Sequence, residues 1–278
     1  MVKIITDTLA CLSEEYARQH EIPIIPQVIY FGNESYLEGV TMDIATFMRR
    51  LVSSPVLPKT AAPPPELFCE AFERFVPSAE PILCIHPSAE VSGTVRSALT
   101  AAEEFPGADI RVIDTRLIAS PLGTVVRLAV KWAEEGMSAD EIQKRVLEMS
   151  QRCHIYFLVA TLEYLQKGGR IGGAQALLGS LLQIKPILAF RDGRVEPYEK
   201  ERTHKRALAR LKELALTQIP RDREGYLTVL HAGVPEEGAA LARELRAALS
   251  LAEVPLYHVP PAIITHGGPG ILGVAFFA

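Results

Sequence analysis

Ser92 stands at the junction between an apolar run and a helical pattern, where its hydroxyl could help to bind an anion. The segment Ser92-Gly93-Thr94 follows the apolar run 81–86 and begins the amphipathic stretch 92–104. A serine at a helix start caps the helix, and the free N–H groups and helix dipole there favour a negative charge. The pattern therefore predicts either a plain helix cap or an anion site at Ser92.

Two further segments offer polar groups beside expected turns. Thr60 lies in what reads as a loop before the helix 65–75, so its hydroxyl is near a helix start. His266 and Gly267 lie in a glycine-rich turn that precedes a last apolar run. Glycines let a ligand approach the backbone, and the imidazole can donate a hydrogen bond to an anion. A purely structural histidine fits the same pattern.

A third candidate is the run 168–173, Gly-Gly-Arg-Ile-Gly-Gly, which carries Arg170. Glycine-rich loops can cradle a phosphate, but this one lacks the Gly-Lys-Ser/Thr ending of a P-loop. The simpler expectation is a flexible turn that carries one exposed arginine.

Two catalytic interpretations stay open from the residues alone. Ser92, His266 and either Asp7 or Asp114 could form a hydrolase triad, although the sequence has no G-x-S-x-G elbow. A histidine phosphocarrier using His266 or His204 is the other. The cysteines are widely spaced and form no C-x-x-C pair, so no metal or redox site is expected.

Composition limits the class of protein. The chain has 278 residues, of which 48% are hydrophobic, and its mean hydropathy is +0.15. No run of eighteen apolar residues occurs, so we expect no integral membrane segment. The first seven residues read as a strand closed by Asp7 and not as a secretory signal, which favours a cytoplasmic protein. The excess apolar residues must be buried in cores, in an oligomer interface or in a ligand cavity.

The net charge of −4 is unevenly distributed. Residues 1–140 carry 11 Lys and Arg against 19 Asp and Glu, a net of −8, whereas residues 151–225 carry 14 against 8, a net of +6. The basic part could face an acidic partner or a phosphate. The low aromatic content and the absence of an RNA-binding motif argue against nucleic acid.

Strand and helix patterns alternate along the chain, which predicts the α/β class with a largely parallel sheet in the first half. We expect a Rossmann-like three-layer domain over 1–153 and an α/β domain with a mixed sheet over 154–278, because Asp192-Gly193 reads as a hairpin turn. The expected strands are 2–6, 24–30, 81–86, 110–114, 155–160, 185–190, 226–231, 254–259 and 271–277. The expected helices are 13–20, 43–53, 65–75, 92–104, 118–135, 138–151, 203–217 and 237–250.

Taken together, these segments resemble the DegV family over nearly the whole length. The strongest likeness is 161–171, Thr-Leu-Glu-Tyr-Leu-Gln-Lys-Gly-Gly-Arg-Ile. The other matching segments are Ile4-Ile5-Thr6-Asp7-Thr8, 59–63, Ser92-Gly93-Thr94, Ile113-Asp114-Thr115, 119–123, 184–188, Asp192-Gly193, Arg202 and 266–270. The sequence departs from the family pattern at Ala61 and Ala62, where the family often has Ser and Gln.

The resemblance implies two α/β domains that hold a buried long-chain fatty acid, with no cofactor and no catalytic residue of the chain's own. In bacteria, several members are the acyl-binding subunit of fatty acid kinase, and a separate ATP-binding subunit phosphorylates the bound carboxylate. By position, the carboxylate would be held by Thr60, Ser92, Gly93, His266 and Gly267. Arg170 and Arg202 would face the kinase subunit and the transferred phosphoryl group.

Elementary energetics agree with such a ligand. About fourteen buried methylenes gain roughly 11 kcal/mol at ~0.8 kcal/mol each, and association entropy offsets much of this gain. A buried carboxyl group needs hydrogen bonds, which hydroxyls, an imidazole and helix amides can supply. Candidate lining residues are Ile24, Ile25, Val28, Leu158, Leu162, Leu177, Leu178, Leu181 and Leu182.

Overall fold

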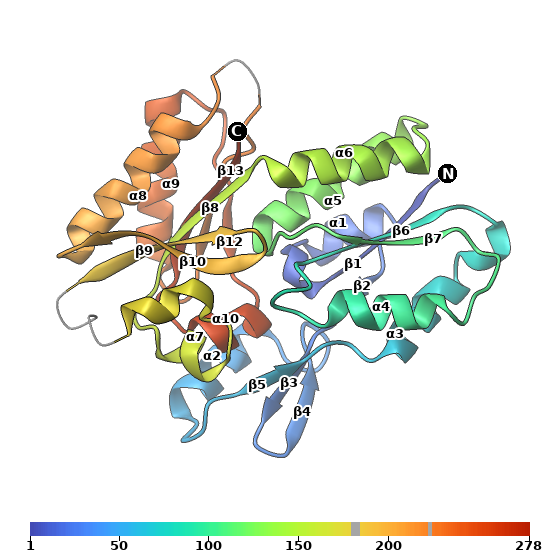
Figure 1. Ribbon diagram of the computed structural model, residues 1–278, viewed down its shortest axis with the longest axis horizontal. Helices are drawn as coiled ribbons and strands as arrows, with labels where there is room; N and C mark the ends of the chain where they lie inside the picture. Colours follow the sequence, from blue (N-terminus) through green and yellow to red (C-terminus); the bar gives the residue numbers. More distant parts are fainter. Residues whose placement is uncertain (179–183, 222–223) are drawn as a thin grey trace. The chain divides into compact units, whose positions relative to one another are not determined.

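The computed structural model describes residues 1–178, 184–221 and 224–278 (Figure 1). Residue contacts divide the chain into two compact units, Met1–Gln151 and Arg152–Ala278. The division lies two residues before the boundary expected from the sequence. Each unit is described by itself below.

The first unit is built on a four-stranded sheet in which every neighbouring pair is parallel. Its strands, in spatial order, are β2 (Ile24–Ile25), β1 (Lys3–Asp7), β6 (Ile82–His86) and β7 (Ile110–Asp114). All five residues of β6 are buried, as expected for a parallel strand that is covered on both faces. The expected parallel sheet of an α/β fold is therefore confirmed.

Helices cover both faces of this sheet. On one face, α3 (Pro65–Glu73) and α4 (Thr94–Ala102) pack together and share a core with strand residues such as Ile5. Successive strand residues point to opposite faces, and α5 (Ala119–Glu134) and α6 (Ala139–Gln151) cover the other one (Figure 1). The short α1 (Glu14–Gln19) follows β1 and a 3-10 turn.

A small antiparallel sheet completes the first unit, and it corrects two expectations. Its spatial order is β4 (Glu34–Leu37), β3 (Val28–Phe31) and β5 (Lys59–Ala61) (Figure 1). Along the chain, α2 (Ile44–Ser53) follows β4 and precedes β5. The expected strand 24–30 is in fact β2 and β3, separated by a proline that cannot donate to a ladder. The expected loop around Thr60 is wrong, because β5 pairs with β3 there.

The second unit contains a six-stranded mixed sheet. Its order is β10 (Arg194–Glu201), β9 (Lys185–Arg191), β8 (Cys153–Leu158), β13 (Leu272–Phe277), β11 (Thr228–His231) and β12 (Leu256–His258). The β11–β12 pair is parallel and the other pairs are antiparallel, which confirms the mixed sheet. Asp192 and Gly193 both have positive φ, 51° and 79°, as a two-residue hairpin requires.

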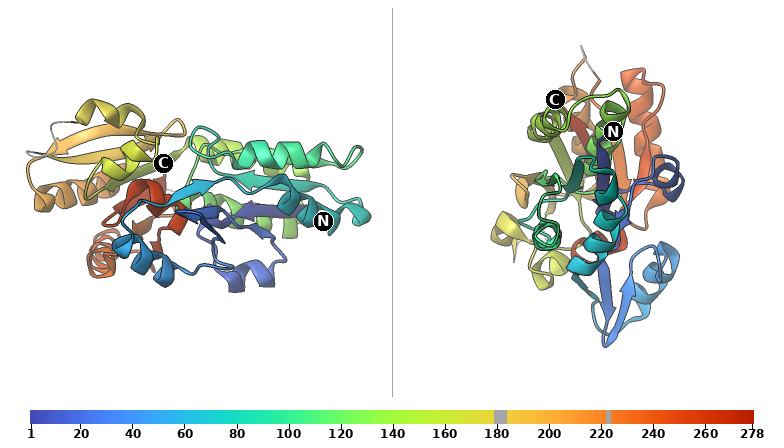
Figure 2. Two further views of the ribbon diagram at one scale, coloured as in Figure 1. Left: turned by 90° about the horizontal axis from the view of Figure 1, so that it is seen from below. Right: turned by 90° about the vertical axis from the view of Figure 1, so that its right-hand side faces the viewer.

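Two long helices, α8 (His204–Gln218) and α9 (Pro235–Leu249), lie side by side on one face of that sheet (Figures 1 and 2). Their leucines pack against β8, β9, β11 and β13 in a single core. Two short helices, α7 (Glu163–Lys167) and α10 (Pro261–Gly267), contact each other. His266 therefore lies in the last turn of a helix, and the expectation of a loop histidine is wrong.

Among the residues described, no helix has both the length and the apolar character to cross a membrane.

Candidate functional site

The first polar cluster, here called the serine cluster, consists of Gln27, Ala62, Ser92, Gly93 and Thr94. It lies where β6 ends and α4 begins, next to the carboxyl ends of the parallel strands. In open α/β sheets this is the end at which ligands bind. The position therefore suits a binding site.

Ser92 lies two residues before the first residue of α4, and Gly93 is the residue that flanks the helix. The Ser92 Oγ accepts a bond from the Thr94 N–H (3.3 Å) and lies 2.7 Å from Thr94 Oγ1. Its side chain is half-buried. Ser92 thus accepts from the first amide of α4, but the expectation that it is the N-cap residue is wrong, because Gly93 occupies that position. The Ser92 side chain keeps an accessible side.

Thr60 belongs to β5, and the residues that follow this strand lie next to the Ser92 turn. A Cβ built on Gly93 would lie 3.1 Å from the Cβ of Ala62, so the segment after β5 lies directly against the Ser92 turn. Thr60 is half-buried and stands opposite Ile29, which places both side chains on the same face of the small sheet. The first unit thus brings Ser92, Gly93 and the Thr60 segment together.

Behind Ser92 lies a buried polar network whose glutamine the sequence analysis missed. Asp7 and His86 are fully buried, and their Oδ2 and Nδ1 atoms are 2.7 Å apart. Gln27, 3% exposed, donates from Nε2 to Asp7 Oδ1 (3.3 Å) and to Thr94 Oγ1 (2.9 Å). Gln27 is a polar residue inside the apolar stretch 24–30, and this interruption was the sequence signal that could have identified it.

A hydrolase needs a base that bonds to the serine hydroxyl. Within the described part of the first unit, the Ser92 Oγ bonds to Thr94 and not to an imidazole. The imidazole of His86 bonds to Asp7 and stands edge-on to Phe68, with the ring centres 5.3 Å apart. This arrangement lends no support to an activated nucleophile at Ser92.

The second polar cluster, here called the histidine cluster, consists of Tyr164, Gly168, Arg170, His266 and Gly268. Gly168 ends α7, and a Cβ built on it would lie 2.3 Å from His266 Nδ1. Gly268 follows α10, and a Cβ there would lie 2.5 Å from the Tyr164 ring. Because Gly168 and Gly268 have no side chain, the His266 ring packs against the backbone at Gly168, and the Tyr164 ring packs against the backbone at Gly268. These two contacts allow α7 and α10 to pack closely.

Arg170 belongs to the same cluster. Its Nη1 donates to the Gly168 carbonyl (2.7 Å), and burial lowers the pKa of its guanidinium. The arginine is half-buried, so the expectation of an exposed loop charge is wrong. Arg202 is exposed just past the end of β10 and lies outside the cluster. His204 is also exposed and pairs with Glu237 at 2.9 Å.

The His266 imidazole is held in its neutral form. Burial is the main cause and the nearby Arg170 cation the second, and together they lower the pKa of His266 to about 4, against a smaller opposing influence of the Gly168 backbone. A neutral imidazole carries one N–H donor. Gly267 is buried beside it, with Ile271 where a Cβ would stand.

This pKa shift predicts a pH-dependent contribution of His266 to stability. An unfolded chain binds a proton on His266 below a pKa of about 6.5, whereas the folded one does so only near 4. The contribution is therefore complete above pH 6.5 and is lost as the pH falls towards 4. Thermal unfolding of the wild type and of His266→Gln from pH 7.5 to pH 4.5 should show a smaller acid loss in the variant. Parallel curves would contradict a buried neutral imidazole.

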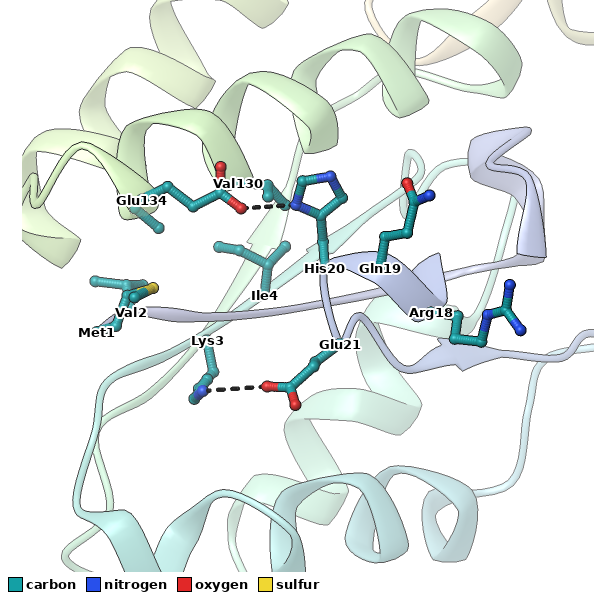
Figure 3. A pocket seen from close by; sticks show the side chains of 11 residues that line it. Met1, Val2, Lys3, Ile4, Arg18, Gln19, His20, Glu21, Val130 and Glu134 are labelled. Carbon is teal, nitrogen blue, oxygen red and sulfur yellow. Dashed lines mark hydrogen bonds and ion pairs between the residues drawn. The ribbon is translucent and has the colours of Figure 1, made fainter. Parts of the chain in front are cut away.

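A shallow pocket of about 370 Å³ lies elsewhere in the first unit, at the amino end of β1 (Figure 3). His20 Nδ1 lies 2.6 Å from Glu134 Oε1, and Lys3 Nζ lies 3.8 Å from Glu21 Oε2. His20 thus pairs with Glu134, and Lys3 with Glu21, at the end of β1 opposite Asp7. The lining mixes these polar groups with apolar residues such as Ile4 and Val130, and it is not the wholly apolar tunnel expected around an alkyl chain.

The candidate apolar lining residues are divided between the two units. The first unit contains Ile24, Ile25 and Val28, and the second contains Leu158, Leu162, Leu177 and Leu178. All seven are buried or half-buried. Leu181 and Leu182 lie outside the described residues. No group of three or more potential metal ligands occurs in residues 1–178, 184–221 and 224–278.

Comparison with known proteins gives a match along the whole chain. A family model described as "Uncharacterised protein, DegV family" matches residues 1–278. A DegV domain-containing protein of Streptomyces coelicolor is 39% identical over 280 residues, covering 98% of this chain and 97% of the relative.

Solved structures of similar proteins show the same fold. DegV of Bacillus subtilis, a fatty acid binding protein, is 32% identical and superposes with a TM-score of 0.89, covering 100% of this chain and 99% of that one. A stearic acid-binding protein of Eubacterium ventriosum is 25% identical with a TM-score of 0.91, covering 100% and 98%. The likeness thus extends over both units.

Proposed function

The chain belongs to the DegV family. We propose that it binds a long-chain fatty acid and presents the carboxylate of that fatty acid to an ATP-dependent kinase subunit. Relatives that bind fatty acids and share the fold over the whole chain support the first half of the proposal. The chain contributes the lipid site, and the partner contributes the nucleotide.

The observation that carries the proposal is the chemistry of the two clusters. Ser92 presents a half-buried hydroxyl beside the first turn of α4, and His266 presents a neutral imidazole. We propose that these groups, with Thr60 and the backbone at Gly93 and Gly267, hold one carboxylate. Neutral donors satisfy a carboxylate without the strong neutralisation that a lysine at the same place would bring. The carboxylate oxygen therefore stays nucleophilic.

The reaction would be a phosphoryl transfer. A carboxylate oxygen attacks the γ-phosphorus of ATP on the partner subunit, forming a new O–P bond. The bond from that phosphorus to the β–γ bridging oxygen breaks, and ADP leaves with the electron pair. We propose that Arg170, whose guanidinium lies near His266 and bonds to the Gly168 carbonyl, stabilises charge on the transferred group. Arg202 is proposed to contact the partner.

Native mass spectrometry tests the lipid-binding half of the proposal. We expect the purified protein to carry one noncovalent adduct with the mass of a long-chain fatty acid, because burial of the alkyl chain outweighs the association entropy. After delipidation, added stearate should restore a one-to-one adduct, and Ser92→Ala should hold it less tightly. An unliganded protein that does not take up stearate would refute the proposal.

A further inference from the structure

A continuous chain of hydrogen bonds links the buried Asp7 to the half-buried Ser92. It runs from Asp7 through Gln27 and Thr94 to Ser92, with distances of 3.3, 2.9 and 2.7 Å. Asp7, Gln27 and Thr94 are at most 3% exposed. Because water has little access to these three side chains, the hydrogens must be arranged among the groups themselves.

Asp7 fixes the direction of this chain at its buried end. Its Oδ1 already accepts the Leu9 N–H at 2.9 Å, so this oxygen acts as an acceptor. The Gln27 Nε2 must then donate to it, and the second hydrogen of the same amide group points to Thr94 Oγ1. The opposite amide orientation would place two oxygens against each other.

The direction continues to Ser92. Thr94 Oγ1 accepts from Gln27, and its own hydrogen needs an acceptor because the side chain is fully buried. Ser92 Oγ, at 2.7 Å, is such an acceptor, and it also accepts the Thr94 N–H at 3.3 Å. With both lone pairs of Ser92 occupied, its hydroxyl hydrogen is left to donate outward.

We infer that Gln27 and Thr94 are positioning residues that turn Ser92 into an obligate hydrogen-bond donor, and thereby select an anionic head group. The inference rests on the proposed function, in which Ser92 binds the fatty acid carboxylate. A carboxylate only accepts hydrogen bonds, and bonds to an ionised acceptor are about twice as strong as neutral ones. A donor with a fixed direction therefore favours a fatty acid over a neutral lipid with the same tail.

The test measures head-group selectivity. Delipidated wild type, Thr94→Val and Thr94→Ser are titrated calorimetrically with palmitate and with hexadecanol, both delivered from cyclodextrin. Thr94→Val should weaken palmitate about tenfold, the loss of one hydrogen bond to a charged group, and should change hexadecanol less than about threefold. Thr94→Ser keeps the hydroxyl and should retain the selectivity of the wild type. Gln27→Met serves as a second variant, with the same expected direction.

A double-mutant cycle separates positioning from general damage. If Thr94 acts through Ser92, Thr94→Val should have no further effect on palmitate binding in a Ser92→Ala background. Thr124→Val is the matched control, because Thr124 is a buried threonine of α5 that bonds to the Ser120 carbonyl and lies outside the network. It should leave the palmitate-to-hexadecanol ratio unchanged.

The outcomes distinguish the inference from the function on which it rests. Additive losses in the cycle, equal losses for both lipids, or unchanged palmitate binding in both Thr94→Val and Gln27→Met would overturn the inference while fatty acid binding stands. A wild-type protein that binds neither lipid would overturn the proposed function, and the inference with it.

Discussion

Gly168→Ala is expected to displace the His266 ring and weaken fatty acid binding by about tenfold or more, through loss of a charge-assisted hydrogen bond. The backbone at Gly168 is right-handed helical, so alanine is not strained there. The effect is steric: the new Cβ would lie 2.3 Å from His266 Nδ1 and 3.0 Å from the Tyr164 carbonyl oxygen. Overpacking of this kind typically destabilises a fold by about 1–3 kcal/mol.

Thermal unfolding and calorimetric titration with palmitate measure both effects of Gly168→Ala. Adding His266→Ala removes the ring, so the double variant should regain stability without regaining affinity. Gly169→Ala is the matched control, because a Cβ there meets nothing within 4 Å and only its φ of +69° is unfavourable. It should destabilise by about 1 kcal/mol and leave affinity intact. If Gly168→Ala bound palmitate like the wild type, the proposed role of the His266 ring would be wrong.

The limits of sequence prediction for this fold follow from element length. Helices such as 118–135 and 138–151 present several turns of apolar periodicity, and the structure contains them as α5 and α6. The helices α7 and α10 have only five and seven residues, too few to show a period or to be stable alone. Tertiary contacts hold them, above all the close approach of Gly168 to His266.

In the candidate site, too, residues in local sequence motifs could be predicted, and residues that depend on tertiary contacts could not. Ser92, His266 and Arg170 stand in short local motifs, which made them visible in the sequence. Gln27 bonds to a threonine 67 positions away, and nothing in a local pattern indicates such a pairing. The half-burial of Arg170 was equally hidden, because it depends on where the loop after α7 packs.

Replacing Arg170 by alanine is expected to lower the rate of acyl phosphate formation about a hundredfold or more while changing palmitate affinity less than about threefold. Removing a cation or donor that stabilises developing charge in phosphoryl transfer has effects of this size. The arginine bonds to the Gly168 carbonyl, so its position is fixed before any partner binds. Hydroxylamine trapping of the acyl phosphate, with an ATP-binding fatty acid kinase subunit present, gives the rate.

Two further variants make the Arg170 result decisive. Arg170→Lys keeps the charge but loses the planar fork of donors, so it should recover only part of the rate. Arg243→Ala removes an exposed arginine of α9 and should leave the rate unchanged. If Arg170→Ala lost palmitate affinity as steeply as it lost the rate, the guanidinium would be a ligand of the carboxylate itself. Its role in phosphoryl transfer would then have to be given to another cation, with the exposed Arg202 the next to test.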